Sequence, residues 1–380
     1  MNYIRSLTSD CCPFLFPETP RNKLIHSYNE SELAILSNQD QKIFSDLAFG
    51  CIIGAMCGDA IGVPLEFKRD VNLEKAKECL RLPGGGPFKL GKGQVTDDSE
   101  LALCLAAGLV EGNGVLDLNK IGGMYHQWFL SRPFDIGITT RTAFKNANNV
   151  VGNDHANVIR ESSLKSINSQ SNGGLMRITP LCVWTSKLTK EEIIKAVRED
   201  TRLTHPNKTA QNVSIAYVYT INHLLNHPGE SKQAYQKCKS LVINDLKDKD
   251  IEGWLQELEG EILPPAHEKI GWVKIAFLYS LHFMRKSVSY EDAMVEMLRQ
   301  GGDTDTNCCI VGGMLGALHG FKGIPEEVRR QVLSFEANQD GGIKRPDYLV
   351  PGKCAERLIE EIIRVRPKKL EVQGEERISQ

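Results

Sequence analysis

The chain has 380 residues and a formal net charge of −2, with 41% apolar and 25% charged residues. These values are ordinary for a soluble globular protein with one or two domains, and they exclude a chain whose overall charge would attract nucleic acid or an anionic membrane. A polyanionic ligand would therefore have to be bound by local chemistry.

The first 40 residues are polar and contain proline, without the apolar core of a secretory signal. We expect residues 1–40 to be a divergent extension and residues 41–366 to form the domain. The longest apolar run, residues 47–58, stops at Asp59 and is shorter than the ~20 residues that a membrane-spanning helix needs. We therefore expect no contact with a membrane.

Helical patterns dominate from residue 41 onward. Glycine recurs every fourth residue from Gly50 to Gly62, and in a soluble helix this spacing predicts close backbone packing in a helical core. Caps and apolar periods predict further helices over residues 273–285 and 290–299, and helices that begin at the capping box 189–192 and at 325–327. No segment alternates as a sheet requires, so we predict an all-α, single-domain fold.

Two segments interrupt the helical pattern. Residues 146–172 are polar, and we expect a long loop there. Residues 367–380 are charged, and we expect them to form a mobile tail. No internal repeat is evident.

Two short acidic runs about two hundred residues apart are the most informative feature of the chain. They read Thr96-Asp97-Asp98 and Asp303-Thr304-Asp305-Thr306. For either run alone, capping of the helix that follows is the simpler interpretation. Carboxylates are rarely buried unless they are paired or bound to metal, and carboxylate and hydroxyl oxygens suit Mg²⁺ or Mn²⁺. If the second run is extended, Asp303 and Asp305 reach the same ion. Together the runs predict a shared site for two divalent cations.

Two glycine-rich loops, residues 83–87 and 169–174, are able to bring backbone amides close to an anion. Such loops are usually only turns, so each is a weak signal by itself. His205 lies in a constrained Thr-His-Pro-Asn turn. Without other evidence, a lone histidine is best taken as a hydrogen-bonded loop residue.

The eleven cysteines form no Cys-x-x-Cys pair, and no histidine cluster has zinc spacing. Several cysteines lie inside helical patterns, which favours reduced core thiols in a cytoplasmic protein over disulfides.

Taken together, five segments resemble the ADP-ribosylglycohydrolase family, which includes the dinitrogenase-reductase-activating glycohydrolases and the ADP-ribosyl-acceptor hydrolases. They are Gly-Asp-Ala-Ile-Gly-Val-Pro-Leu-Glu-Phe at 58–67, Thr-Asp-Asp at 96–98, Ser-Asn-Gly-Gly-Leu-Met-Arg at 171–177, Thr-His-Pro-Asn at 204–207 and Gly-Gly-Asp-Thr-Asp-Thr at 301–306. They occur in family order across about 250 residues, which makes the resemblance specific.

The resemblance implies a compact all-α fold with two divalent ions, Mg²⁺ or Mn²⁺, in a central cleft. It implies metal ligands at Thr96, Asp97, Asp98, Asp303, Asp305 and Thr306. It places Glu66 near the scissile bond and ADP-ribose along Ser171, Asn172, Gly173, Gly174 and Met176, with His205 near a ribose or phosphate.

The implied reaction is hydrolysis of the bond between C1″ of the distal ribose and its acceptor. A carboxylate must then deprotonate water or protonate the leaving group, and Glu66 and Asp98 are the candidates. The segment at 58–67 looks more like the arginine-directed branch than the serine-directed one. The implied partner is an ADP-ribosylated protein, bound through its ADP-ribose, and we expect a monomer.

Three alternatives remain open at the level of sequence. The bond could be O-linked, as in serine-linked ADP-ribose, poly(ADP-ribose) or O-acetyl-ADP-ribose. The protein could be a non-catalytic relative that only binds ADP-ribose, although the presence of all six implied ligands favours an enzyme. A magnesium-dependent phosphohydrolase would need a basic residue facing phosphate, and only Lys92 and Arg299 lie near the runs.

Overall fold

The computed structural model describes residues 39–374. The chain divides into two units, Met1–Lys42 and Ile43–Gln380, and the second contains nearly all of the described fold. The expected extension at residues 1–40 lies outside the described residues except for its last two, which begin a helix.

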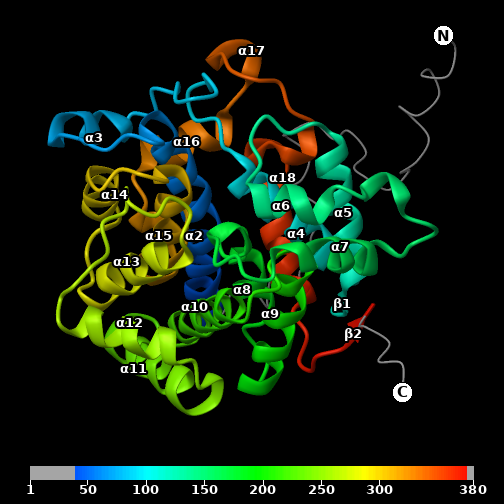
Figure 1. Cartoon of the computed structure of the whole chain (residues 1–380). Coiled ribbons are helices and arrows are strands. Elements are labelled where there is room, and N and C mark those ends of the chain that lie inside the picture. Colours follow the sequence, from blue (N-terminus) through cyan, green and yellow to red (C-terminus); the bar gives the residue numbers. More distant parts are fainter. Residues whose placement is uncertain (1–38, 375–380) are drawn as a thin grey trace, which may run out of the picture. The chain divides into compact units, whose positions relative to one another are not determined.

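The described residues are almost entirely helical (Figure 1). The α-helices are α2 (Gln39–Gly62), α3 (Leu73–Cys79), α4 (Asp97–Gly112), α5 (Leu118–Leu130), α6 (Ile138–Phe144), α7 (His155–Ser163), α8 (Thr179–Trp184), α9 (Lys190–Thr204), α10 (Lys208–Asn226), α11 (Ser231–Ser240), α12 (Lys249–Glu259), α13 (Val273–Arg285), α14 (Tyr290–Arg299), α15 (Thr304–His319), α16 (Glu326–Ser334), α17 (Ala337–Asp340) and α18 (Pro351–Val365). Two-residue strands β1 (Leu116–Asp117) and β2 (Val372–Gln373) pair in parallel. The all-α prediction is confirmed.

Helices α2 and α15 pack backbone to backbone, as the glycine spacing predicts. A Cβ atom on Gly58 would lie 2.0 Å from the carbonyl oxygen of Cys308, and one on Gly316 would lie 1.9 Å from that of Gly50. Tyr290 of α14 donates its hydroxyl to the carbonyl of Gly54 at 2.6 Å, which ties a third helix to this pair. Only glycine allows helices to approach this closely, so the packing fixes where α15 begins relative to the end of α2.

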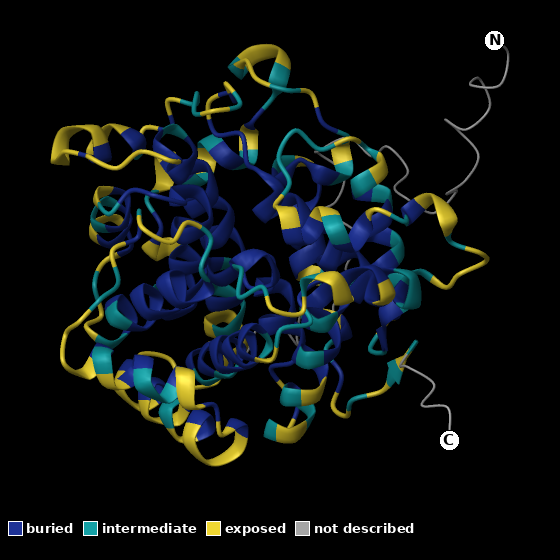
Figure 2. Ribbon diagram, in the orientation of Figure 1, coloured by how far each residue is buried: buried dark blue, intermediate teal, exposed yellow. Residues whose placement is uncertain are grey.

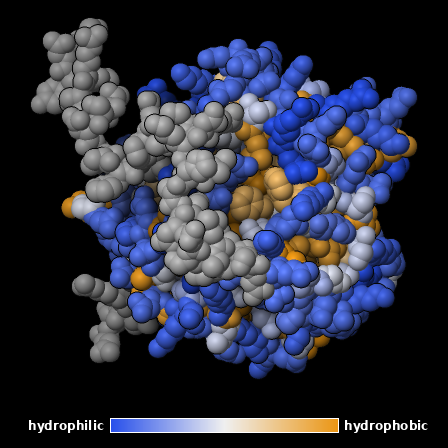
Figure 3. All heavy atoms as spheres, turned by 180° about the vertical axis from the view of Figure 1, so that it is seen from behind, coloured by the Kyte–Doolittle hydropathy of each residue, from blue (hydrophilic) through white to orange (hydrophobic). Residues whose placement is uncertain are grey.

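The burial pattern identifies α2 as a core helix. Residues Gln39–Leu65 are long and apolar enough, by length and composition alone, to cross a membrane, so the apolar stretch is longer than the sequence pattern indicated. Of its most apolar window, 89% is buried inside the protein, as expected for a core helix (Figure 2). The face seen in Figure 3 is mostly hydrophilic, with an apolar area among the charged side chains.

The expected long loop at residues 146–172 is wrong in part, because α7 and two 3₁₀ turns lie within it. Helix α7 buries only two apolar residues, Ala156 and Ile159, together with the polar residues Arg160, Ser162 and Ser163. A short helix with one narrow apolar face gives too weak a pattern to be recognised.

The C-terminal segment makes specific contacts as far as the structure describes it. The amide of Leu370 donates to Glu192 at 2.9 Å, and Arg160 donates to the carbonyl of Gly374 at 2.6 Å. Residues 375–380 of the expected mobile tail lie outside the described residues.

Candidate active site

Helix ends bring the two acidic runs together. Thr96 caps the N-terminus of α4, which places Asp97 and Asp98 in the first turn. Asp303 precedes α15 and Asp305 lies in its first turn, so the second run is the start of a helix and not the extended segment that we expected. The hydroxyl of Thr306 donates to Asp98 Oδ2 at 3.3 Å and joins the two runs directly.

A backbone contact between Gly302 and the loop after α2 brings the carboxylate of Glu66 to the start of α15. Phe67 donates its amide to the carbonyl of Gly302 at 2.7 Å, and Gly302 donates to the carbonyl of Lys68 at 2.8 Å. Gly301 and Gly302 both have positive φ, and a Cβ on Gly301 would lie 2.2 Å from the Lys68 oxygen. The pairing therefore requires glycine, and it holds Glu66 beside the start of α15.

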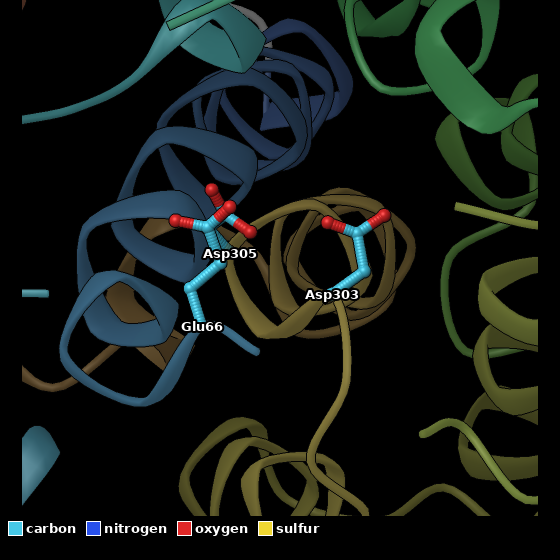
Figure 4. Close-up of side chains that lie close together, drawn as sticks. All are labelled: Glu66, Asp303 and Asp305. Atoms are coloured by element: carbon cyan, nitrogen blue, oxygen red, sulfur yellow. The ribbon is translucent and has the colours of Figure 1, made fainter. Parts of the chain in front are cut away.

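The resulting acidic cluster consists of Glu66, Asp303 and Asp305. One carboxylate oxygen from each lies within 4.8 Å of the others, and all three residues are buried. Figure 4 shows the carboxylates of Glu66, from the segment after α2, and Asp305 close together, with that of Asp303 beside them at the start of α15. Glu66 Oε2 and Asp305 Oδ1 are buried without a hydrogen-bond donor, as is Asp98 Oδ1.

The electrostatics show that the carboxylates cannot all be ionised without a counter-charge. Burial, with Asp135 and Asp303 nearby, raises the pKa of Glu66 to about 9. Burial raises the pKa of Asp305 well above its usual range, and repulsion from Glu66 and Asp303 adds to the effect. Burial also raises the pKa of Asp98, and repulsion from Asp59 and Asp303 adds to the effect. Protons or cations must therefore neutralise the cluster.

The residues fit divalent cations. The donors are carboxylate oxygens, several of them are buried and unpartnered, and hydroxyl groups lie beside them. The threonine hydroxyls are also used within the protein, because Thr96 Oγ1 lies 3.0 Å from Asp98 Oδ2 and 3.0 Å from Asp59 Oδ1. This arrangement leaves Asp98 Oδ1 as the free oxygen of that carboxylate.

Asp59, within the segment at 58–67, lies at the site, although its sequence predicts no role for it. It is completely buried and accepts hydrogen bonds from the amides of Thr96 and Ser99 at 3.0 and 3.2 Å. The Ser99 hydroxyl donates to it at 2.5 Å. Asp59 therefore fixes the N-terminus of α4 against α2, and burial raises its pKa to about 6.

Asp135 was missed altogether. It is half-buried on the loop between α5 and α6, and it contributes to the raised pKa of Glu66 and of Asp97. Burial, Asp303 and Asp59 raise its own pKa to about 7. Nothing in its local sequence, Arg-Pro-Phe-Asp-Ile-Gly, distinguishes it from an ordinary loop aspartate.

The second glycine-rich loop adjoins the cluster. Asn172 donates its side-chain amide to Asp303 Oδ2 at 2.7 Å and its backbone amide to the carbonyl of Gly271 at 2.9 Å. The Ser171 hydroxyl lies 3.0 Å from Thr139 Oγ1. A Cβ on Gly271 would lie 3.8 Å from Asp303 Oδ2, so residue 271, to which the sequence analysis gave no role, is also close to the cluster.

His205 lies beneath that loop. Its ring is buried, Nδ1 lies 2.8 Å from the Thr204 hydroxyl, and Nε2 has no partner. A Cβ on Gly173 would lie 3.0 Å from His205 Nε2, and one on Gly174 would lie 3.2 Å from the ring. Burial, with Arg177 nearby, lowers the pKa of His205 to about 3, so the ring is neutral at physiological pH.

Met176 is also buried next to the loop, and its carbonyl accepts a hydrogen bond from the Cys309 thiol at 3.4 Å. The first glycine-rich loop is a tight turn, in which Gly85 exchanges both backbone hydrogen bonds with Leu90 at 2.8 Å. The Gly85 amide is therefore occupied, which supports the simpler interpretation of that loop.

Comparisons with known proteins agree with this geometry. A family model described as ADP-ribosylglycohydrolase matches residues 40–368. A provisionally named ADP-ribosyl glycohydrolase of Acanthamoeba polyphaga mimivirus is 31% identical over 77% of this chain and 92% of its own length. An ADP-ribosylarginine hydrolase of Serratia proteamaculans is 26% identical over 74% of each chain. A solved structure described as an ADP-ribosylglycohydrolase-related protein complex has a TM-score of 0.65 at 22% identity, covering 86% of this chain and 99% of that one, and shows the shared fold.

Proposed function

Because this chain belongs to the ADP-ribosylglycohydrolase family and is a glycosidase that acts on ADP-ribose, we propose that it removes ADP-ribose from arginine side chains of modified proteins with the help of divalent cations. The observation that carries the proposal is the buried acidic cluster of Glu66, Asp303 and Asp305, with its unpartnered oxygens.

Asp98, Asp303 and Asp305 are the residues that we propose hold the ions, with Thr96, Asp97 and Thr306 beside them. The free oxygens Asp98 Oδ1 and Asp305 Oδ1 support this assignment. Bound Mg²⁺ or Mn²⁺ would supply positive charge that orients the ribose and makes a water molecule more acidic. Asn172 holds Asp303 through its side-chain amide.

We assign proton transfer to Glu66 and Asp135 in place of the expected Asp98, because the hydroxyls of Thr96 and Thr306 donate to Asp98 Oδ2. In the reaction, a water oxygen bonds to C1″ as the bond from C1″ to the arginine nitrogen breaks. One water proton passes to a carboxylate, and the departing guanidine takes a proton from a carboxyl group. Asp135 and Glu66 are the carboxyl groups that we assign to these two roles; burial and neighbouring carboxylates raise the pKa of both in the metal-free protein.

The choice of arginine rests on charge. A guanidinium group is attracted to carboxylates, and Asp135 is a half-buried carboxylate that contributes to the raised pKa of Glu66. The arginine-directed relative from Serratia proteamaculans supports the same choice. The described cysteines are all free and buried, which supports a reducing compartment such as the cytoplasm.

The test is release of ADP-ribose from arginine-modified and from serine-modified protein, each with Mg²⁺, with Mn²⁺ and with EDTA. We expect metal-dependent release from the arginine substrate. Asp135→Asn should lower it at least tenfold, whereas Asp245→Asn, a surface carboxylate paired with Lys190, should not. If ADP-ribose is released from the serine substrate alone, the acceptor is serine and not arginine. Release that EDTA does not reduce would refute the role of the cations.

A further inference from the structure

The loop that carries Asp135 lacks regular structure of its own. Residues 131–137 connect α5 to α6, and Arg132 has a positive φ of 58°, which is unfavourable for a residue with a side chain. A carboxylate on such a loop can act on a reacting group only if another part of the protein fixes the loop.

Arg345, between α17 and α18, provides this fixation. Its guanidinium donates to the carbonyls of Ser131 and Arg132 at 3.2 and 3.4 Å and to Ser131 Oγ at 2.8 Å. It also lies over the ring of Phe134, at 5.8 Å from the ring centre. Four contacts from one buried group therefore hold the first half of the loop, up to the residue before Asp135.

The other side of the same guanidinium is fixed to the helix that carries the first acidic run. Arg345 Nε and one terminal nitrogen donate to the two oxygens of Glu100 at 2.7 and 2.9 Å, a bidentate pair buried on both sides. Trp128 also donates to Glu100, at 2.7 Å. Glu100 lies in the first turn of α4, two residues after Asp98, so the pair connects the Asp135 loop to the metal-binding end of α4.

We propose that Arg345, held by Glu100, is a positioning residue that fixes the loop carrying Asp135 and thereby the Asp135 carboxylate. The proposal rests on the function proposed above, because it gives Asp135 a part in the reaction. A planar guanidinium can donate to Glu100 and to the loop at the same time, whereas the single ammonium group of a lysine cannot reproduce both sets of contacts.

The test compares Arg345→Lys, Asp135→Asn and the double variant. Arg345→Lys should lower kcat about tenfold or more while KM changes less than about twofold, since the contacts of the Asn172 loop remain. In the Asp135→Asn background the same change should have almost no further effect on kcat. If the two losses multiply independently, or if Asp135→Asn retains wild-type activity, the proposal is wrong.

Arg160→Lys is the matched control for general destabilisation. It disturbs another buried arginine–glutamate pair, from Arg160 of α7 to Glu199 of α9 at 3.1 Å. An equal loss of kcat in this variant would show that Arg345 acts only through stability. Should Arg345→Lys fail to fold, Ser131→Ala removes the contact of the Ser131 hydroxyl with Arg345, together with its hydrogen bond to the Trp128 carbonyl, and leaves the pair with Glu100 intact. It should lower kcat in the same direction by a smaller factor, and an unchanged kcat would contradict the proposal.

Hydrogen exchange tests the same inference without turnover. In Arg345→Lys the amides of residues 131, 132 and 134–137 should exchange faster than in the wild-type protein, while those at the start of α15 keep their rates. Unchanged exchange in this loop would overturn the inference even if the enzyme is active. If the wild-type protein releases no ADP-ribose, faster exchange would still support Arg345 as the group that holds the loop, and only the function proposed above would fail.

Discussion

Replacing Gly62 by alanine is expected to damage the acidic cluster through the backbone alone. A Cβ atom on Gly62 would lie 2.3 Å from both the Cα of Asp305 and the carbonyl oxygen of Thr304. Ordinary contact between carbon atoms begins near 3.5 Å, so α2 and α15 would have to separate by roughly 1 Å. Such overpacking lowers the free energy of unfolding by about 1–3 kcal/mol.

The same displacement moves Asp305 away from Glu66, and a shift of this size in a catalytic group can lower the rate about a hundredfold. Gly62→Ala should therefore lose stability, metal-induced stabilisation and ADP-ribose release together. These are measured by denaturant unfolding, by thermal unfolding with and without Mg²⁺, and by the release assay.

Gly253→Ala is the control for the effect of alanine itself. Gly253 lies within α12, and a Cβ there would meet nothing within 4 Å. This variant should gain up to about 1 kcal/mol from helix propensity and keep full activity. Wild-type stability and turnover in Gly62→Ala would refute the claim that backbone contact between α2 and α15 positions the cluster.

Three further predictions concern the buried charges. Asp305→Asn should raise the melting temperature of the metal-free protein, because it removes one of several carboxylates that repel one another. The same variant should lose both stabilisation by Mg²⁺ and turnover. A lower melting temperature without metal would contradict the repulsion argument. Because folding raises the pKa of Glu66 from 4.5 to about 9, the native state keeps a proton that the unfolded chain releases, so the metal-free protein should lose stability as the pH rises from 5 to 9. Thermal unfolding in EDTA across this range measures the slope, Mg²⁺ should stabilise the protein more at pH 9 than at pH 6, and a flat profile would count against protonation of Glu66. Arg177→Met should lower the free energy of unfolding by about 3 kcal/mol or more, because it leaves Asp200 buried without its partner at 3.7 Å, and adding Asp200→Asn should recover part of the loss.

The local chemistry of the chain was readable from its sequence. Glycine at every fourth residue of α2 predicts close helix packing, because a helix face without side chains lets another backbone come into contact with it. The structure confirms this packing. The capping box at Thr189 and the cap at Ser289 are likewise found where the sequence predicts them. Caps and periodicity depend on residues three or four positions apart, so no tertiary information is needed to find them.

The sequence also pointed to both acidic runs, since several carboxylates beside apolar helices call for a counter-charge. It could not show that Thr306 reaches Asp98, because that contact joins residues 208 positions apart. Asp135 and Arg345 gave no signal for the same reason: an aspartate in a loop and an arginine before a helix are ordinary until the fold places them together. Only the tertiary structure decided which carboxylates share one buried space, because burial and repulsion depend on what surrounds a group in three dimensions and not on its neighbours in the chain.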